Sequence, residues 1–278
     1  MIKVADLSFY YDPRQVLFKG LSLELKKNKT LAILGPNGVG KTTFLRCLMR
    51  FLRLKTGGIY INGIESRDIP DSLFWRTVSY VPQAKNIVFG YSVLNMILMG
   101  RCPYIGMGRQ PKKEDLRAAR ETMTRLGLED LAERSCGSLS GGELQMTLIA
   151  RALVKNPSLL IMDEPESNLD MKNQLKVLDI IQNLKDERNL TIILNTHFPT
   201  HAMRVADKVL LLGKDRYLYD DTRRAITEQN IMEYFGVFSE IVEMESAART
   251  IHAVVPTEIA GSKESIPVKE CLYEKVVS

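Results

Sequence analysis

The sequence predicts an α/β fold with an antiparallel β subdomain and an inserted α-helical subdomain. First, the apolar run Leu31–Leu34 leads through a glycine-rich loop into a helical pattern that continues to Leu52. Second, apolar runs typical of buried strands recur at residues 159–163, 191–195 and 208–212. Third, residues 88–135 change to helical patterns, which indicates an insertion. Strands that alternate with helices are typical of an α/β core.

The loop at residues 35–43 matches the pattern G-x-x-x-x-G-K-[ST] in full. Its glycines allow the backbone N–H groups to surround a phosphate chain, and the helix that follows presents its N-terminus there. We expect Lys41 to reach the β- and γ-phosphates and Thr42 to hold Mg²⁺. The alternative is a plain glycine-rich turn. The expected nucleotide contacts are Gly35, Pro36, Asn37, Gly38, Val39, Gly40, Lys41, Thr42 and Thr43.

Composition bounds the possible partners. The chain has 278 residues, 45% of them apolar and 26% charged, as in an ordinary soluble protein. Its net charge of +5 is too small to indicate nucleic-acid binding. The four cysteines are scattered and predict reduced thiols rather than disulfides or a zinc site. We expect no signal peptide and no membrane span, so that any membrane role requires a partner.

Residues 2–34 alternate in places and predict strands joined by turns at 12–14 and 26–29. Tyr11, at the end of the first strand, could stack on a purine or cap the sheet edge. Gly57-Gly58 predicts a turn, followed by a strand at 59–63 that runs into a hairpin-type turn.

The strand at 77–81 ends at Pro82-Gln83. Gln83 could bind the metal or its water, or be an ordinary exposed glutamine. Beyond it, Ser92 begins a helix, residues 100–108 form a break, and a charged helix covers 112–126. No heptad pattern is sustained, which argues against a coiled-coil arm.

A second helix start suited to anions lies at Ser140, Gly141 and Gly142. Ser140 could also be simply the N-cap, and both interpretations are compatible because a cap with free amides binds phosphate.

The buried strand at 159–163 ends in Asp163-Glu164. Asp163 suits Mg²⁺, and Glu164 could polarise the attacking water; the alternative is two exposed acids. Asp170 could cap the next helix. His197 follows the strand at 191–195 and could touch the γ-phosphate, whereas a metal site with His201 is disfavoured by the intervening proline and the absence of a third ligand.

The strand at 208–212 is expected to be the last of the core, with short helices at 221–236. Beyond Gly236, runs at 240–244 and 250–255 predict a short β hairpin, and a mixed tail follows. We therefore divide the chain into a domain at 1–236, with its helical subdomain at about 88–157, and an extension at 237–278.

Taken in order, these signals resemble an ABC-type ATPase cassette over residues 1 to about 236. The resemblance implies a P-loop (RecA-like) core, ATP and Mg²⁺. It implies that Tyr11 stacks on adenine, that Gln83 begins a loop that senses a membrane partner, and that Asp163 completes the magnesium site. The catalytic residues would be Lys41, Glu164 as the base and His197 as the switch histidine.

The resemblance also implies a head-to-tail homodimer, in which ATP on the phosphate loop of one copy meets Ser140, Gly141 and Gly142 of the other. Permease subunits in the membrane, and indirectly a substrate-binding protein, would be its partners, with no nucleic acid. The location would be peripheral, on the cytoplasmic face of the cell membrane.

Residues 99–104, Met-Gly-Arg-Cys-Pro-Tyr, are similar to a stretch in importer ATPases for metal chelates such as iron–siderophore, haem or cobalamin. Molybdate or tungstate importers, exporters, soluble ABC ATPases and non-hydrolysing subunits are the alternatives. Two stretches depart from the family pattern: residues 166–168 are Glu-Ser-Asn where Thr-Ser-Ala is more usual, and His197 is followed by Phe198-Pro199 where an acidic residue is common. We expect neither to touch the chemistry of the site.

Overall fold

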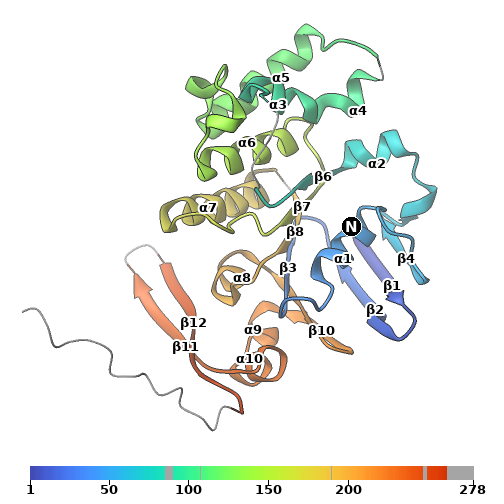
Figure 1. The fold of residues 1–278 in the computed structure, drawn as a ribbon, viewed down its shortest axis with the longest axis vertical. Helices are drawn as coiled ribbons and strands as arrows, with labels where there is room; N and C mark the ends of the chain where they lie inside the picture. The colour runs from blue at the N-terminus through green and yellow to red at the C-terminus, as the bar shows by residue number, and fades with distance from the viewer. Residues whose placement is uncertain (85–89, 107, 189, 247–248, 262–278) are drawn as a thin grey trace, which may run out of the picture.

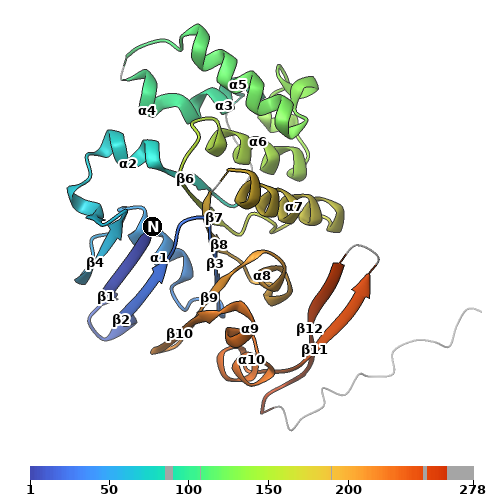
Figure 2. The ribbon, with the colours of Figure 1, turned by 180° about the vertical axis from the view of Figure 1, so that it is seen from behind.

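The computed structural model describes residues 1–84, 90–106, 108–188, 190–246 and 249–261. A six-stranded sheet occupies the middle of the molecule, with a four-stranded antiparallel sheet to one side (Figure 1). A group of helices gathers at one end, and a two-stranded hairpin lies toward the other (Figures 1 and 2). The α/β class with an antiparallel sheet and a helical insertion is confirmed.

The six-stranded sheet has the order β10-β9-β3-β8-β7-β6. All neighbours pair in parallel except β9 and β10. The strands are β3 (Thr30–Leu34), β6 (Val78–Val81), β7 (Leu159–Asp163), β8 (Thr191–Asn195), β9 (Lys208–Gly213) and β10 (Arg216–Asp221). The expectation that β9 is the last strand of the core is wrong. Residues 216–221 return antiparallel along its edge after a two-residue turn, in a hairpin that the half-buried pattern of β10 did not reveal.

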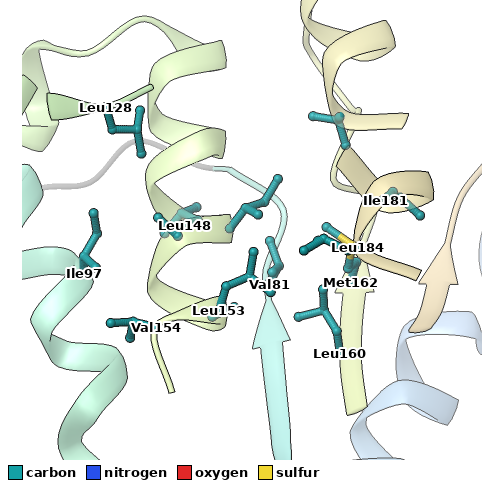
Figure 3. Close-up of a cluster of buried hydrophobic side chains, with 14 of the residues drawn as sticks. Val81, Ile97, Leu128, Leu148, Leu153, Val154, Leu160, Met162, Ile181 and Leu184 are labelled. Atoms are coloured by element: carbon teal, nitrogen blue, oxygen red, sulfur yellow. The ribbon is translucent and has the colours of Figure 1, made fainter. Parts of the chain in front are cut away.

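Both faces of this sheet are covered, which explains the continuous apolar runs. Leu31 and Ile33 face one hydrophobic cluster, while Ala32 and Leu34 face another. In β7, Leu160 and Met162 lie on the side of the helical group (Figure 3). This alternation follows from the two-residue period of a strand.

The helical group comprises α3 (Val93–Leu98), α4 (Cys102–Ile105), α5 (Lys113–Leu126) and α6 (Gly141–Leu153), with 3₁₀ turns at Met99–Arg101, Glu129–Leu131 and Cys136–Ser138. The break expected at 100–108 is only partial, because Met99–Ile105 stays helical; Met107 lies outside the described residues. Figure 3 shows Ile97, Leu148 and Val81 in the cluster that joins these helices to the sheet.

The antiparallel sheet has the order β2-β1-β4-β5. Its strands are β1 (Ile2–Asp12), β2 (Gln15–Leu25), β4 (Thr56–Ile61) and β5 (Ile64–Glu65). The turn predicted at Gly57-Gly58 is wrong, because both glycines lie inside β4. Ala5 pairs with Gly58 and Ser8 with Thr56, so β1 carries an extra residue opposite Gly57. The glycine marks a β-bulge instead of a turn.

The remaining helices are α1 (Lys41–Leu48), a 3₁₀ turn at Ser66–Asp68, α2 (Asp71–Thr77), α7 (Met171–Arg188), α8 (Pro199–Val205), α9 (Thr222–Ala225) and α10 (Glu228–Phe235). Helix α1 is shorter than the apolar pattern predicted, since the backbone turns left-handed at Arg50, where φ is 66°. The Asp170 carboxylate accepts a 2.8 Å hydrogen bond from the Asn173 N–H, so Asp170 does cap the start of α7.

Strands β11 (Val237–Ser246) and β12 (Arg249–Ile259) form the hairpin beyond Gly236. Ile241 and Val254 on one of its faces pack against the cluster under α8, α9 and α10. The predicted tail lies outside the described residues from 262 onward, as does Cys271. In the part of the chain that the structure describes, no helix combines the length and the apolar character needed to cross a bilayer.

Replacing Gly57 by alanine tests the bulge. A Cβ atom there would lie 2.3 Å from the Asp6 carbonyl oxygen and 2.4 Å from that of Ala5. We expect Gly57→Ala to lower the free energy of unfolding by about 3 kcal/mol, measured by urea denaturation.

Gly63→Ala is the matched control. Gly63 also has a positive φ, but its Cβ would meet nothing within 4 Å, so its loss should be only about 1 kcal/mol. Equal losses in the two variants would contradict the steric explanation for Gly57.

Candidate functional site

A pocket of about 380 Å³ lies where the central parallel strands end. Because β3, β7 and β8 run in parallel, the segments that follow them meet at one edge of the sheet. The pocket is lined by Tyr11, Gln15, Leu17, Asn37, Gly38, Gly40, Lys41, Thr42, Thr43, Glu164 and His197. Four separate parts of the sequence thus form one site. Gln15 and Leu17, which sequence reasoning missed, come from β2, and no local pattern marks them.

The glycine-rich loop joins β3 to α1 and forms the floor of the pocket. At Gly35 φ is +147°, and a Cβ would lie 2.1 Å from the Leu212 carbonyl oxygen, so only glycine fits. A Cβ on Gly38 would meet nothing within 4 Å, which leaves the loop open on the pocket side. An open loop of this kind, followed by a helix N-terminus, suits a phosphate chain.

Lys41 is almost completely buried within the loop. Its Nζ donates to the carbonyl oxygens of Gly35, at 2.6 Å, and Pro36, at 2.9 Å. Burial lowers the pKa of Lys41 to about 8, against the opposing charges of Glu164 and Asp163. A negatively charged ligand in the pocket would therefore stabilise the ammonium form of Lys41.

Tyr11 stands at the rim of the pocket. Its side chain is 62% exposed, its hydroxyl lies 3.4 Å from Oγ1 of Thr43, and the Phe9 ring packs edge-on against it. An exposed ring supported from beneath is available to stack on a flat ligand. Thr42 and Thr43 also line the pocket.

Asp163 ends β7 beside the pocket but is not part of its lining. The Asn195 side-chain amide donates to Oδ1 at 2.6 Å, and the Tyr80 hydroxyl lies 3.3 Å from Oδ2. Sequence reasoning missed both partners. For Asn195 the available signal was an amide side chain at the end of the buried strand β8. The hydroxyl of Thr42 and the carboxylate of Asp163 are oxygen ligands of the type that Mg²⁺ prefers.

Glu164 is the centre of the polar contacts at the sheet edge. Its Oε1 contacts Nε2 of His197, while its Oε2 accepts from Gln83 Nε2 at 3.3 Å and from the Ser167 hydroxyl at 3.0 Å. Its backbone has a positive φ of 48°, and its N–H donates to the Asn195 carbonyl at 2.9 Å. The structure thus brings together Gln83, Glu164 and His197. Residues 85–89, where the partner-sensing loop would continue, lie outside the described residues.

Ser140, Gly141 and Gly142 lie elsewhere and do not line the pocket. Ser140 caps α6: its Oγ accepts from the Glu143 N–H at 3.3 Å, and its own N–H donates to the Glu143 carboxylate at 2.8 Å. A Cβ on Gly142 would lie 2.6 Å from the Asn173 side chain. The two helix starts suited to anions are therefore separate within one chain.

The two histidines near β8 face different carboxylates. His197 contacts Glu164, and Nδ1 of His201 lies 3.6 Å from Oε1 of Glu166. Among the residues that the structure describes, no three His, Cys, Asp or Glu side chains form a metal cluster.

Comparison with known proteins adds to this geometry. The sequence model of the ABC transporter family matches residues 18–167. The molybdate import ATP-binding protein MolC of Haemophilus influenzae is 36% identical over 84% of this chain and 87% of its own length. The Helicobacter pylori protein named probable iron chelatin transport ATP-binding protein is 35% identical over 87% of this chain and 95% of its own.

A solved structure has a similar fold. The inward-facing structure of a transporter described as being of the metal-chelate type has a TM-score of 0.83 and 33% identity. The similarity covers 92% of this chain and 97% of that one.

The lowered pKa of Lys41 predicts how ATP affinity depends on pH. Phosphates that bind beside the ammonium group favour its charged form, so they raise its pKa above the value of about 8 in the free protein. Below that value the affinity is at its full level. As the pH rises from 8 to 9.5, binding must first take up a proton, and affinity should fall by up to about 10-fold per pH unit.

Calorimetric titration with ATP between pH 7 and 9.5 would measure this dependence. In Lys41→Arg the guanidinium group keeps its proton, so the slope should disappear whatever the absolute affinity. An affinity of the unmodified chain that is constant over the whole range would contradict the role of Lys41.

Proposed function

The chain belongs to the ABC transporter ATPase family, and from that membership we propose that it energises the import of a metal chelate, such as iron–siderophore, haem or cobalamin. Members of this family in import systems hydrolyse ATP and work with permeases in the membrane. The observation that supports hydrolysis by this chain is the arrangement of Lys41, Glu164 and His197 around one pocket. The metal-chelate cargo is supported by the similarity of residues 99–104 to importers of that class.

Each group at the pocket has a separate role in this proposal. Lys41 and the loop amides bind the β- and γ-phosphates, and the Tyr11 ring stacks on adenine. Glu164 accepts a proton from the attacking water, and His197 contacts the γ-phosphate. These residues act by position and charge, as is usual in phosphoryl transfer.

Thr42, Gln83 and Asp163 are the residues that would hold Mg²⁺. When bound, the ion neutralises charge on the β- and γ-phosphate oxygens. Asn195 and Tyr80 keep the Asp163 carboxylate oriented through their hydrogen bonds to its two oxygens.

We infer a head-to-tail homodimer from the position of the second helix start. Ser140, Gly141 and Gly142 carry features of an anion site yet lie outside the pocket of their own chain. In the dimer they would close over ATP bound to the other copy. Closing would then act on the permease through the segment that follows Gln83, with the ATPase held peripherally on the cytoplasmic face of the membrane.

The division of the chain is part of the same proposal. Residues 1–236 form the ATPase domain, with the helical subdomain at about 88–157, and residues 237–278 are an extension. Import of molybdate or tungstate is the second candidate function, favoured by the 36% identity to MolC.

Substitution of the two charged residues tests the assignment of the site. We expect Glu164→Gln to retain ATP binding and to lower turnover by roughly 10²–10⁴-fold, because the amide cannot accept the proton. Lys41→Ala should instead lose ATP affinity. Phosphate release and equilibrium binding are the measurements. Lys27→Ala is the control, because Lys27 is exposed and lies in the turn before β3, at the end of that strand away from the glycine-rich loop. Near-normal turnover in Glu164→Gln would remove the residue from the role of base.

A pull-down tests the partners and the cargo. Glu164→Gln with ATP present serves as bait in detergent-solubilised membranes, because a slow variant keeps the ATP-bound state. Recovery of a multi-span permease supports the importer, and recovery of a soluble partner alone contradicts it. The binding protein that works with the permease is then titrated with ferric siderophore, haem, cobalamin and molybdate. Binding of molybdate alone would contradict the metal-chelate cargo.

A further inference from the structure

Glu166 is a completely buried carboxyl group that the proposed chemistry does not use. It lies on the loop between β7 and α7, two residues after Glu164, and its exposed fraction is 0%. Water solvates a carboxylate strongly, so its burial is unfavourable unless hydrogen-bond donors or a cation replace the water. The groups that contact Glu166 therefore indicate what its carboxylate does.

Two side chains from the segment after β8 face this carboxyl group. The Thr196 hydroxyl donates a hydrogen bond to Oε1 of Glu166, and Nδ1 of His201 lies 3.6 Å from the same oxygen. Within the described part of the chain, Oε2 of Glu166 and Nδ1 of His201 have no hydrogen-bond partner. The imidazole of His201 thus packs beside the buried carboxyl group.

The same contacts hold the backbone on both sides of His197. Thr196 precedes His197, and its Oγ1 accepts a 3.1 Å hydrogen bond from the N–H of Phe198, which follows it. The N–H of His201 donates to the Phe198 carbonyl at 3.0 Å, and the centroids of their two rings lie 4.7 Å apart. His197 is therefore bracketed by residues that contact Glu166 directly or through Thr196.

The backbone of Glu166 fixes its own loop in turn. Its carbonyl oxygen accepts from the Leu169 N–H at 3.4 Å and from Nε2 of Gln174, on α7, at 3.5 Å. The contact between His197 and Glu164 then completes a closed ring of interactions between the two loops. A closed ring restrains each member more than any single bond would.

We propose that Glu166, together with Thr196 and His201, is a positioning residue that holds the His197 ring against Glu164. This inference rests on the proposed roles of Glu164 and His197 in ATP hydrolysis. Because His197 is oriented before ATP arrives, less rotational freedom is lost in reaching the transition state. Loss of Glu166 should therefore slow hydrolysis without weakening ATP binding.

The two departures from the family pattern belong to this one cluster. Glu166 stands where the family more often has threonine, and Phe198 stands where an acidic residue is common. In the structure both contact Thr196 and His201. The buried carboxylate and the ring after His197 are thus parts of one arrangement beside His197. Under this proposal, the expectation that neither departure touches the chemistry is wrong.

Steady-state ATPase kinetics of the full chain test the proposal. For Glu166→Ala we expect kcat to fall about 10-fold, with KM for ATP unchanged within about twofold. Thr196→Val, which removes only the bridging hydroxyl, should have the same effect and serves if Glu166→Ala folds poorly. Glu166→Gln keeps an oxygen that can accept from Thr196, so it should recover part of the rate.

A double-mutant cycle separates positioning from a general structural role. In a His197→Ala background, adding Glu166→Ala should change kcat by less than about twofold, because the group that it positions is already absent. Asp207→Asn is the matched control. Asp207 pairs with Lys29 at 3.0 Å and Lys185 at 3.1 Å away from the pocket, so its loss should lower Tm and leave kcat unchanged.

Two results would overturn the inference while leaving the proposed function intact. One is a kcat unaffected by both Glu166→Ala and Thr196→Val, and the other is a loss from Glu166→Ala that is equally large with and without His197. Full activity of His197→Ala would overturn the role of His197 itself, and the inference with it.

Discussion

The parallel pairing of β3, β8 and β7 is the constraint on which the rest of the structure depends. In this register Ile33 pairs with Asn195, and Asn195 pairs with Asp163, so the three strands end level with one another. The glycine-rich loop, the acidic pair and His197 each begin where one of these strands stops. A shift of one residue in either pairing would exchange the side chains that enter the two hydrophobic clusters on either face of the sheet, and the close packing of both clusters opposes such a shift.

The charges gathered at that edge depend on one another because Lys41 and Asp163 are buried and Glu164 is half-buried. Burial disfavours the ammonium form of Lys41, while Asp163 and Glu164 favour it. Glu164 is in turn shared by His197, Gln83 and Ser167. Each of these groups is held by contacts to the others. The arrival of a phosphate chain, which supplies negative charge beside Lys41, is therefore expected to redistribute contacts across the whole edge.

The helical group does not line the pocket; it presents the N-terminus of α6 away from it. Helix α6 is joined to the sheet by apolar contacts that include Leu148, Leu153 and Val81 (Figure 3). These contacts fix the direction in which its capped N-terminus points. Because Ser140 and the two glycines lie away from the nucleotide loop of their own chain, completion of the site by a second copy is the arrangement that we propose.

Local sequence determined the glycine-rich loop, the capped start of α6, the acidic pair at the end of β7 and the histidine that follows β8, because each depends on residues close together along the chain. Only the tertiary structure decided which side chains meet across the sheet edge. Asn195 on Asp163, Gln83 on Glu164 and Glu166 on Thr196 join segments about 30 to 80 residues apart. The bulge at Gly57 likewise depends on its partner strand β1, about 50 residues earlier in the chain. Such contacts follow from strand order and register, which no short pattern of residues encodes.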